Sequence, residues 1–400
     1  MHVPPLLLEW LGALARWVHV IAAIMWIGDS FLFMWMDASL EQPRKPRDGD
    51  VQGELWLVHS GGFYEVVKRR SLRPEELPRN LYWFKWQAYS TWISGVFLMA
   101  MVYWLGDSAL LVDSGSRLSH GQAILVSVGS LLAGWLVYDL ACRSPLATKP
   151  RVLTLLLAAA LCATVCALTL VFGARAAWLQ TGAIIGTIMV SNVAHVIVPG
   201  QRKMLAQTRA GQPVDTGPGR LAKYRSTHNH YLTLPVLFMM LSQHFPSGYG
   251  HPLSWLVLLL ITAFGIVLKY IMNFRTRSDW RVVTFGAVTL LAAIVLTARP
   301  GVGRAAAGST LSGTVPDEQA FAIVERRCTT CHSEHPSNPS FPEPPSGVKL
   351  DSPGRLRAMA ARVQVRAIET RTMPLGNLTG MTDAERDTLG AWLAGLRDGR

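Results

Sequence analysis

Long runs of apolar residues recur along most of the chain before residue 300. A helix of about 20 apolar residues crosses the core of a bilayer, and eight segments approach that length. They run approximately over residues 10–36, 81–104, 121–140, 152–172, 177–198, 227–243, 253–273 and 282–298. This pattern predicts an all-α fold, a polytopic membrane bundle of about eight transmembrane helices.

The composition agrees with a membrane protein. Half of the residues (50%) are apolar and only 16% are charged, which is too few charges for an ordinary soluble protein. The first apolar stretch, residues 6–36, is too long for the core of a signal peptide, so it is expected to be the first transmembrane helix.

Positively charged residues concentrate in alternate connections. The connections after the first, third, fifth and seventh predicted helices contain 20 Lys and Arg, whereas those after the second, fourth and sixth contain 2. The positive-inside rule then places the odd connections in the cytoplasm and both termini outside. The net charge of +12 therefore reflects topology, and we expect no nucleic-acid partner.

The composition changes after residue 298. Residues 300–314 are rich in Gly, Ala and Ser, as in a flexible tether, and a polar segment follows. A domain this small needs a bound group to complete its core. The predicted organisation is an integral membrane domain (residues 1–298), a flexible linker (299–314) and a small domain outside the membrane (315–400).

Cys328-Thr329-Thr330-Cys331-His332 has the spacing of a c-type haem attachment site. Cys328 and Cys331 can form thioethers to the haem, and the imidazole of His332 becomes an axial ligand of the iron. Met373, which precedes a proline, is the expected second iron ligand, and Met381 is the alternative. The sequence thus predicts an electron-transfer protein with a covalent haem c in a class I cytochrome c domain.

Two helices should frame this haem domain. Residues 317–327 have a helical pattern with Phe321 on the apolar face, and residues 382–385 read as a capping box. The helix that the capping box starts should pack on the Phe321 face through Leu389, Trp392, Leu393 and Leu396.

Ionisable groups inside the predicted spans are costly to bury, so each is a candidate for function. His19 lies near the middle of the first span and Asp29 towards its cytoplasmic end. We expect His195, His228 and His230, with Asp29, to converge near the cytoplasmic boundary, and His195, His228 and Asp29 are the catalytic candidates. Pro235 and the flanking histidines suggest that the weakly apolar span 227–243 lines a polar site.

Residues next to these spans are candidates for substrate binding. Arg202 and Lys203 follow the fifth span, and the paired glycines of loop 59–65, which begins at His59, allow close backbone approach to a ligand. His59 and His228 also have an ordinary interpretation as solvated histidines. Lys269, like Lys85, is expected to extend its ammonium to the cytoplasmic surface.

Several short motifs together resemble one family. Residues 15–19 (ARWVH), 26–28 (WIG), 83–86 (WFKW), 92–95 (WISG) and 228–235 (HNHYLTLP) are similar to the bacterial integral-membrane urate hydroxylases of the PuuD type, which carry a C-terminal cytochrome c domain. The segment from His19 to Gly28 is also similar to membrane-bound protoporphyrinogen oxidases, which bind haem b.

The first resemblance implies a urate oxidase of the bacterial inner membrane. Urate would be oxidised to 5-hydroxyisourate with water as the oxygen source, and electrons would pass to the attached haem. Arg202 or Lys203 would then pair with the planar urate anion, and His195 or His228 would accept a proton. The expected partners are urate, the lipid bilayer and a respiratory-chain electron acceptor.

The predicted topology creates a difficulty of distance. Electrons released near the cytoplasmic face would have to cross an apolar layer of about 30 Å to reach a periplasmic haem. Either a haem b bound through His19 relays them, or the site lies nearer the periplasm, around His19 and His244. A membrane cytochrome that relays electrons from quinol, or a transporter with an appended cytochrome, is also compatible with the sequence.

Overall fold

The computed structural model describes residues 5–274, 279–298 and 315–397; the predicted linker therefore lies outside the described residues. Helices dominate the part before residue 299. Their bounds are α1 Pro5–Ala38, α2 Trp86–Met99, α3 His120–Arg143, α4 Pro150–Val171, α5 Ala174–Asn192, α6 Val198–Arg209, α7 Gly217–Leu241, α8 Pro246–Tyr249, α9 Ser254–Asn273 and α10 Trp280–Ala298. The π-helical turns Ala100–Trp104 and Val193–Ile197 extend α2 and join α5 to α6.

Each of the eight predicted spans contains a helix. Among the described residues, six helices are long and apolar enough to cross a membrane by length and composition: 9–38, 120–143, 150–171, 174–209, 254–273 and 280–298. The second and sixth predicted spans are not among them, because α2 has only 14 residues and the first half of α7 is polar. A count of eight spans therefore stays a prediction.

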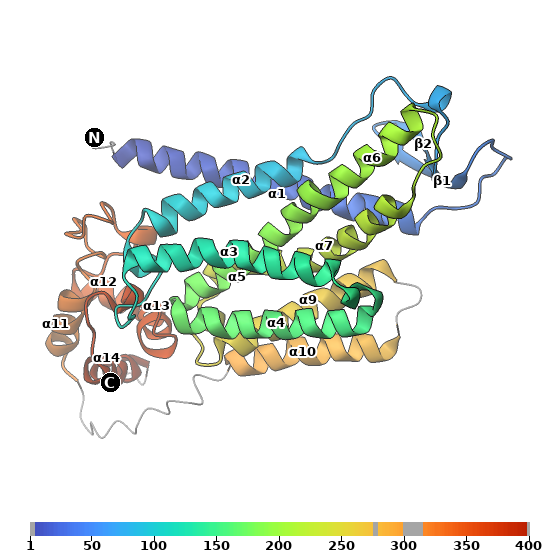
Figure 1. The fold of residues 1–400 in the computed structure, drawn as a ribbon. Helices are drawn as coiled ribbons and strands as arrows, with labels where there is room; N and C mark the ends of the chain where they lie inside the picture. Colours follow the sequence, from blue (N-terminus) through green and yellow to red (C-terminus); the bar gives the residue numbers. More distant parts are fainter. Residues whose placement is uncertain (1–4, 275–278, 299–314, 398–400) are drawn as a thin grey trace.

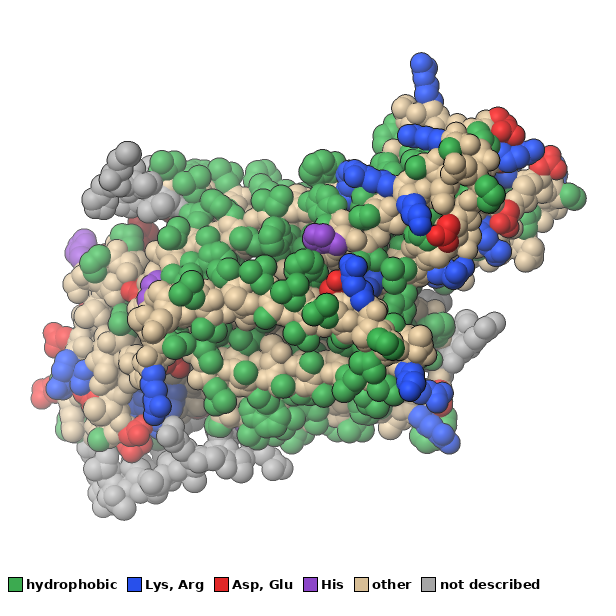
Figure 2. Space-filling view, viewed as in Figure 1, with side chains coloured by type: hydrophobic (Ala, Val, Ile, Leu, Met, Phe, Trp, Pro, Cys, Tyr) green, Lys and Arg blue, Asp and Glu red, His purple; other side chains and the backbone are tan. Residues whose placement is uncertain are grey.

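The continuous helix from α5 to α6 is the centre of the bundle. In an apolar 18-residue stretch of this helix 67% of the residues are buried, whereas in the corresponding stretch of α1 only 6% are buried. Helices α3, α4 and α7 pack against α5, α9 packs between α7 and α10, and α1 pairs mainly with α2 (Figure 1). Apolar side chains cover the flank of the bundle, and charged side chains gather at its two ends (Figure 2). This distribution is compatible with a flank that faces hydrocarbon.

Glycines allow the central helices to approach closely. A Cβ atom on Gly134 of α3 would lie 2.5 Å from Ile184 of α5, and one on Gly182 of α5 would lie 2.9 Å from Met239 of α7. Small residues at such contacts are typical of helices that associate in membranes.

The connection between α1 and α2 departs from the all-α prediction. It forms an antiparallel hairpin of β1 (Val51–His59) and β2 (Gly62–Arg69). Ser60 and Gly61 form the turn with φ of 51° and 76°, the combination that a two-residue hairpin of type I′ requires. Of the paired glycines, Gly61 lies in the turn and Gly62 begins β2. The hairpin lies at one end of the bundle, which we call the hairpin end (Figure 1).

Residues 315–397, here called the C-terminal unit, form a separate helical layer. Its helices are α11 Asp317–Arg327, α12 Pro353–Ala358, α13 Ala360–Val363 and α14 Asp383–Arg397, with a π-helical turn at Gln364–Glu369. The predicted bounds of α11 and the predicted packing are confirmed, since Ile323 and Val324 share one core with Leu389, Trp392 and Leu393, and Phe321 and Leu396 pack against it.

The C-terminal unit packs on the end of the bundle opposite the hairpin, which we call the docking end (Figure 1). The Ser114 amide donates to the Gly376 carbonyl oxygen (2.7 Å), and Arg366 Nη1 donates to the Tyr249 hydroxyl (2.9 Å). Gly250 allows this approach, because a Cβ atom there would lie 2.7 Å from Thr370.

We expect Gly134→Val to destabilise the bundle by roughly 1–3 kcal/mol, because the new methyl groups would overlap Ile184 and force α3 from α5. The measurement is the thermal unfolding of the purified protein in detergent. The matched control is Gly129→Val on the same helix, where a Cβ atom meets nothing within 4 Å. Equal melting temperatures of the two variants would show that the α3–α5 contact is not this close.

Candidate functional site

A cavity of about 760 Å³ lies between the C-terminal unit and the docking end of the bundle. Residues from both parts line it. The C-terminal unit contributes Cys328, Cys331, His332, Met359 and Met373, and the bundle contributes Arg175, Gln243, His244, Tyr249 and His251. The volume is within the usual range of ligand pockets, roughly 300–1,000 Å³. The predicted haem-binding residues therefore face the bundle.

The attachment motif forms a tight turn directly after α11. Cys328 ends the helix, and its carbonyl oxygen accepts hydrogen bonds from the amides of Cys331 (3.2 Å) and His332 (2.9 Å). Burial raises the pKa of the Cys328 thiol to about 12. The turn thus brings both thiols and the imidazole to one wall of the cavity.

The orientation of His332 suits a metal ligand. Its Nδ1 lies 3.1 Å from the carbonyl oxygen of Val348, the geometry of a donated hydrogen bond, and burial lowers the pKa of the imidazole. A histidine that donates from one nitrogen to a carbonyl keeps a lone pair on the other nitrogen for a metal. Nε2 of His332 is therefore available to iron.

Three methionines could supply the second axial ligand. Met373 and Met359 line the cavity with His332. Met381 is 3% exposed and belongs to the apolar core of the C-terminal unit. Thioether sulfur together with imidazole and two thiols is the donor set of a c-type haem, so the residues present fit that group.

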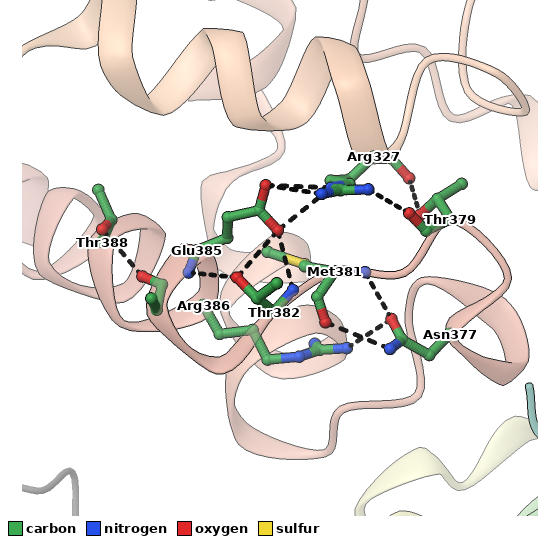
Figure 3. Close-up of polar contacts among 9 residues, drawn as sticks. Arg327, Asn377, Thr379, Met381, Thr382, Glu385, Arg386 and Thr388 are labelled. Carbon is green, nitrogen blue, oxygen red and sulfur yellow. Dashed lines mark hydrogen bonds and ion pairs between the residues drawn. The ribbon is translucent and has the colours of Figure 1, made fainter. Parts of the chain in front are cut away.

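Arg386 of α14 contacts the loop that follows Met373, where its Nη2 donates to Asn377 Oδ1 at 3.5 Å (Figure 3). Arg386, which is 5% exposed, donates to the carbonyl oxygens of Ala367 and Met373, the latter at 2.8 Å. Asn377 exchanges hydrogen bonds with the backbone of Met381, at 3.0 and 3.2 Å. The buried guanidinium therefore fixes the backbone of the predicted iron ligand.

A half-buried ion pair joins α11 to α14. Arg327 donates to both carboxylate oxygens of Glu385 at 3.1 Å and also to the Thr379 carbonyl oxygen. Glu385 accepts from the Thr382 amide (2.8 Å) and Thr382 Oγ1 accepts from the Glu385 amide (3.2 Å), which confirms the predicted capping box. Burial alone would raise the pKa of Glu385, but these hydrogen bonds and Arg327 hold the pKa below its usual value.

A network of polar side chains lies inside the bundle between α3, α5 and α7. The Tyr138 hydroxyl lies 2.7 Å from Nδ1 of His228, and Asn192 Nδ2 donates to Tyr138 (3.1 Å) and to Asn229 (2.9 Å). Arg225, which is 1% exposed, donates to Asn192 (3.2 Å) and pairs with Asp139 (2.8 Å). We call these six residues the inner network.

His230 lies on the opposite side of α7 from His228, because residues two apart on a helix do not share a face. Its ring nitrogens lie 2.8 Å from Asn273 Oδ1 and 3.5 Å from Ser30 Oγ. Lys269 is 1% exposed, with its ammonium over the ring of Phe31, so the expectation that it reaches the surface is wrong. An aromatic face stabilises a desolvated ammonium there.

The other catalytic candidates are not brought into one cluster. The ring of His195 stacks near Trp135 (5.1 Å between centroids), and its Nδ1 lies 3.2 Å from the Ser191 carbonyl oxygen. Asp29 has a buried carboxylate oxygen with no hydrogen-bond partner in the described part of the chain.

The substrate-binding candidates lie at the hairpin end. Arg202 lines a second cavity of about 720 Å³ with Lys85 and Arg209, and Lys203 pairs with Asp215 at 3.2 Å. His59 is exposed and bonds to Ser60 (2.7 Å) in the hairpin turn. These residues do not meet the inner network or the docking-end cavity.

His19 lies between α1 and α2. Its Nδ1 is 3.0 Å from the Thr91 carbonyl oxygen and 3.0 Å from Ser94 Oγ, and Gly95 makes room for the ring, since a Cβ atom there would lie 3.0 Å from Cε1. A hydrogen bond of Nδ1 to a carbonyl leaves Nε2 available, as in His332.

Several residues of these sites were missed in the sequence. Tyr138, Asn229 and Arg225 were not singled out as site residues. Arg225 lies before Thr227, where the sixth span was predicted to begin, so it was counted as a charge of the preceding loop. In the structure α7 begins ten residues earlier, at Gly217, and Arg225 is inside the helix. Arg175 stands in the short connection between the fourth and fifth predicted spans, and Gln243 is the last residue of the sixth predicted span. A basic residue in a connection otherwise poor in charge is the signal that could have indicated Arg175.

Comparisons with known proteins give one match. A family model described as urate oxidase N-terminal matches residues 5–298. No curated protein and no solved structure matches the chain.

We expect Arg386→Lys to lower the stability of the C-terminal unit, because one ammonium cannot reach both carbonyl oxygens and each hydrogen bond to a charged group contributes roughly 1.5–3 kcal/mol. Thermal unfolding of residues 315–397 in the full-length protein, monitored by the exchange of their amide hydrogens, measures this. The control, Arg355→Lys, alters an ion pair of a side chain that is 44% exposed and should stay within about 0.5 kcal/mol of the parent. If both variants melt alike, Arg386 does not fix the loop.

Proposed function

Since the chain belongs to the urate oxidase N-terminal family, we propose that it is a membrane-bound urate hydroxylase linked to its own cytochrome c. Urate and water would give 5-hydroxyisourate, two protons and two electrons, and the electrons would pass to the haem of the C-terminal unit. The observation that carries the proposal is that the family match spans the bundle, and that the bundle shares one cavity with Cys328, Cys331, His332 and Met373.

The residues assigned to the haem are those of the cavity wall. Cys328 and Cys331 would attach it, and His332 and Met373 would ligate the iron. Met373 is preferred to Met381, which is enclosed in the apolar core, and to Met359, whose loop lacks the Arg386 anchor. When bound, a c-type haem supplies a one-electron acceptor.

The location follows from the same proposal. The bundle would lie in the bacterial inner membrane with both termini in the periplasm, because the described basic connections, α1–α2, α3–α4 and α6–α7, lie at the end away from the C-terminal unit (Figure 1). A respiratory acceptor would then reoxidise the haem from the periplasmic side.

Protons must leave the substrate together with electrons. A neutral imidazole is suited to accept them, and His195, His228 and the carboxylate of Asp29 stay the candidates inside the bundle. Of these, His228 is the one engaged by several buried polar groups, through Tyr138 and the rest of the inner network.

We expect urate to reduce the c-type haem of the purified protein without oxygen, with one urate reducing two haems because the oxidation releases two electrons. The reduced haem absorption band measures it, and labelled water should place its oxygen in the product. Xanthine, which lacks the 8-oxo group, serves as the control. Reduction by quinol but not by urate would favour an electron-relay subunit and end the proposal.

A haem b at His19 is a separate prediction, supported by its free Nε2 and the room beside Gly95. Extraction into alkaline pyridine should then find a non-covalent haem besides the covalent one, and His19→Ala should lose only the non-covalent haem, because it removes an axial ligand. The matched control is His120→Ala, whose Nε2 hydrogen-bonds to the Tyr103 carbonyl oxygen. One haem per chain in the parent protein would exclude haem b.

A further inference from the structure

The place of urate oxidation is limited by the distance to the electron acceptor. A substrate at the hairpin end would lie a bilayer thickness, about 30 Å, from the haem-binding turn. The docking-end cavity removes this difficulty, because bundle residues and the haem-binding turn line the same space. A substrate in that cavity would need no relay.

The bundle wall of the cavity carries an unusual polar pair. Arg175 Nη2 donates to Gln243 Oε1 at 2.9 Å, while Nε of Arg175 is buried and has no hydrogen-bond partner among the described residues. Arg175 belongs to the first turn of α5, which begins at Ala174 without a side-chain cap. The first amides of α5 and the helix dipole favour negative charge, and the Asp113 carboxylate already lies at this helix end, with Oδ1 3.0 Å from the position of a Cβ atom on Gly173.

The remaining charges of the wall also favour an anion. Arg362 and Arg366 line the cavity in addition to Arg175, and Asp113 is the carboxylate residue that lines it. Arg371 also lines the cavity but forms an ion pair with Asp383. Arg327, which also lines it, is neutralised by Glu385. The local field therefore attracts a small anion from the aqueous side.

The shape of the polar groups selects a particular kind of anion. Arginine presents a planar fork of donors, and a glutamine amide presents one donor and one acceptor. The edge of a purine-trione anion such as urate alternates carbonyl oxygens and ring nitrogens and so complements both. His244 lines the same cavity, and no hydrogen bond of its imidazole to another described residue is observed.

We propose that the urate anion binds in the docking-end cavity, against Arg175 and Gln243 and facing the Cys328–His332 turn. This inference rests on the proposed function. In the reaction a water O–H bond breaks as the water oxygen bonds to carbon 5 of the purine, so that the urate anion and water give the 5-hydroxyisourate anion, two protons and two electrons. His244 and solvent accept the protons. A haem held by the Cys328–His332 turn would accept the electrons one at a time, with reoxidation by its own acceptor between them. Arg175 and Gln243 orient the purine and stabilise its negative charge.

The same guanidinium could instead hold a haem propionate, which is also an anion. The test therefore measures two properties of the full-length holoprotein. Equilibrium dialysis of urate is carried out with the haem already reduced, so that urate binds without reacting, and a redox titration gives the haem reduction potential.

We expect Arg175→Gln to raise the Kd for urate by about tenfold or more, the equivalent of one lost hydrogen bond to a charged group, with an unchanged reduction potential and haem spectrum. Gln243→Leu should raise Kd in the same direction. The matched control, Arg117→Gln, removes a charge from a docking-end loop outside the cavity and should leave Kd unchanged.

Two results would overturn the inference. A shifted potential in Arg175→Gln with unchanged Kd would assign the guanidinium to a haem propionate. A raised Kd in Tyr138→Phe, with parental Kd in Arg175→Gln, would move the substrate to the inner network. Either result leaves the proposed function intact, whereas a parent protein that neither binds urate nor is reduced by it would end both.

Discussion

The contact between the C-terminal unit and the docking end is the interaction on which the candidate site depends. Arg366 bonds to Tyr249, and Tyr249 packs edge-on against Trp178 of α5, at 6.4 Å between ring centroids. The docked loop is thereby tied to the most buried helix of the bundle. Because both parts belong to one chain, the contact forms at a high effective concentration and needs little interface area. Without it, His332 and Arg175 would not share a cavity.

Burial of polar groups imposes the second constraint. Arg225 is tolerated inside the bundle because Asp139 and Asn192 surround it, and removal of one partner of a buried pair typically costs about 3–5 kcal/mol. Hydrogen bonds among its side chains join α3, α5 and α7, which gives the inner network a structural role. Among the described residues, Arg225 and Arg175 each have a buried Nε without a hydrogen-bond partner, but only Arg175 of the two lines the docking-end cavity. A hydrogen-bonding group that is unmet at the wall of a cavity can be satisfied by a ligand.

How much the sequence could predict depended on how local each feature is. The bounds of α11, the capping box at Thr382 and six of the eight apolar spans follow from short-range patterns, and the structure agrees with them. The hairpin between the first two apolar spans was missed. The separation of His228 from His230 follows from their spacing on α7, since residues two apart on a helix do not share a face, but the partners that each finds on other helices do not. Arg175 and Gln243 become site residues only through docking of a segment far away in the chain.

The close packing of α5 on α7 then has a consequence for chemistry. Gly182 lets Met239 approach, and this contact sets the distance between the start of α5 and the end of α7. Arg175 stands two turns before Gly182, and Gln243 one turn after Met239, so their 2.9 Å hydrogen bond is a result of that helix contact. Rigid helices hold polar groups more accurately than loops do. The bundle can therefore act as the support of a site that lies at its end, where water and the electron acceptor are both within reach.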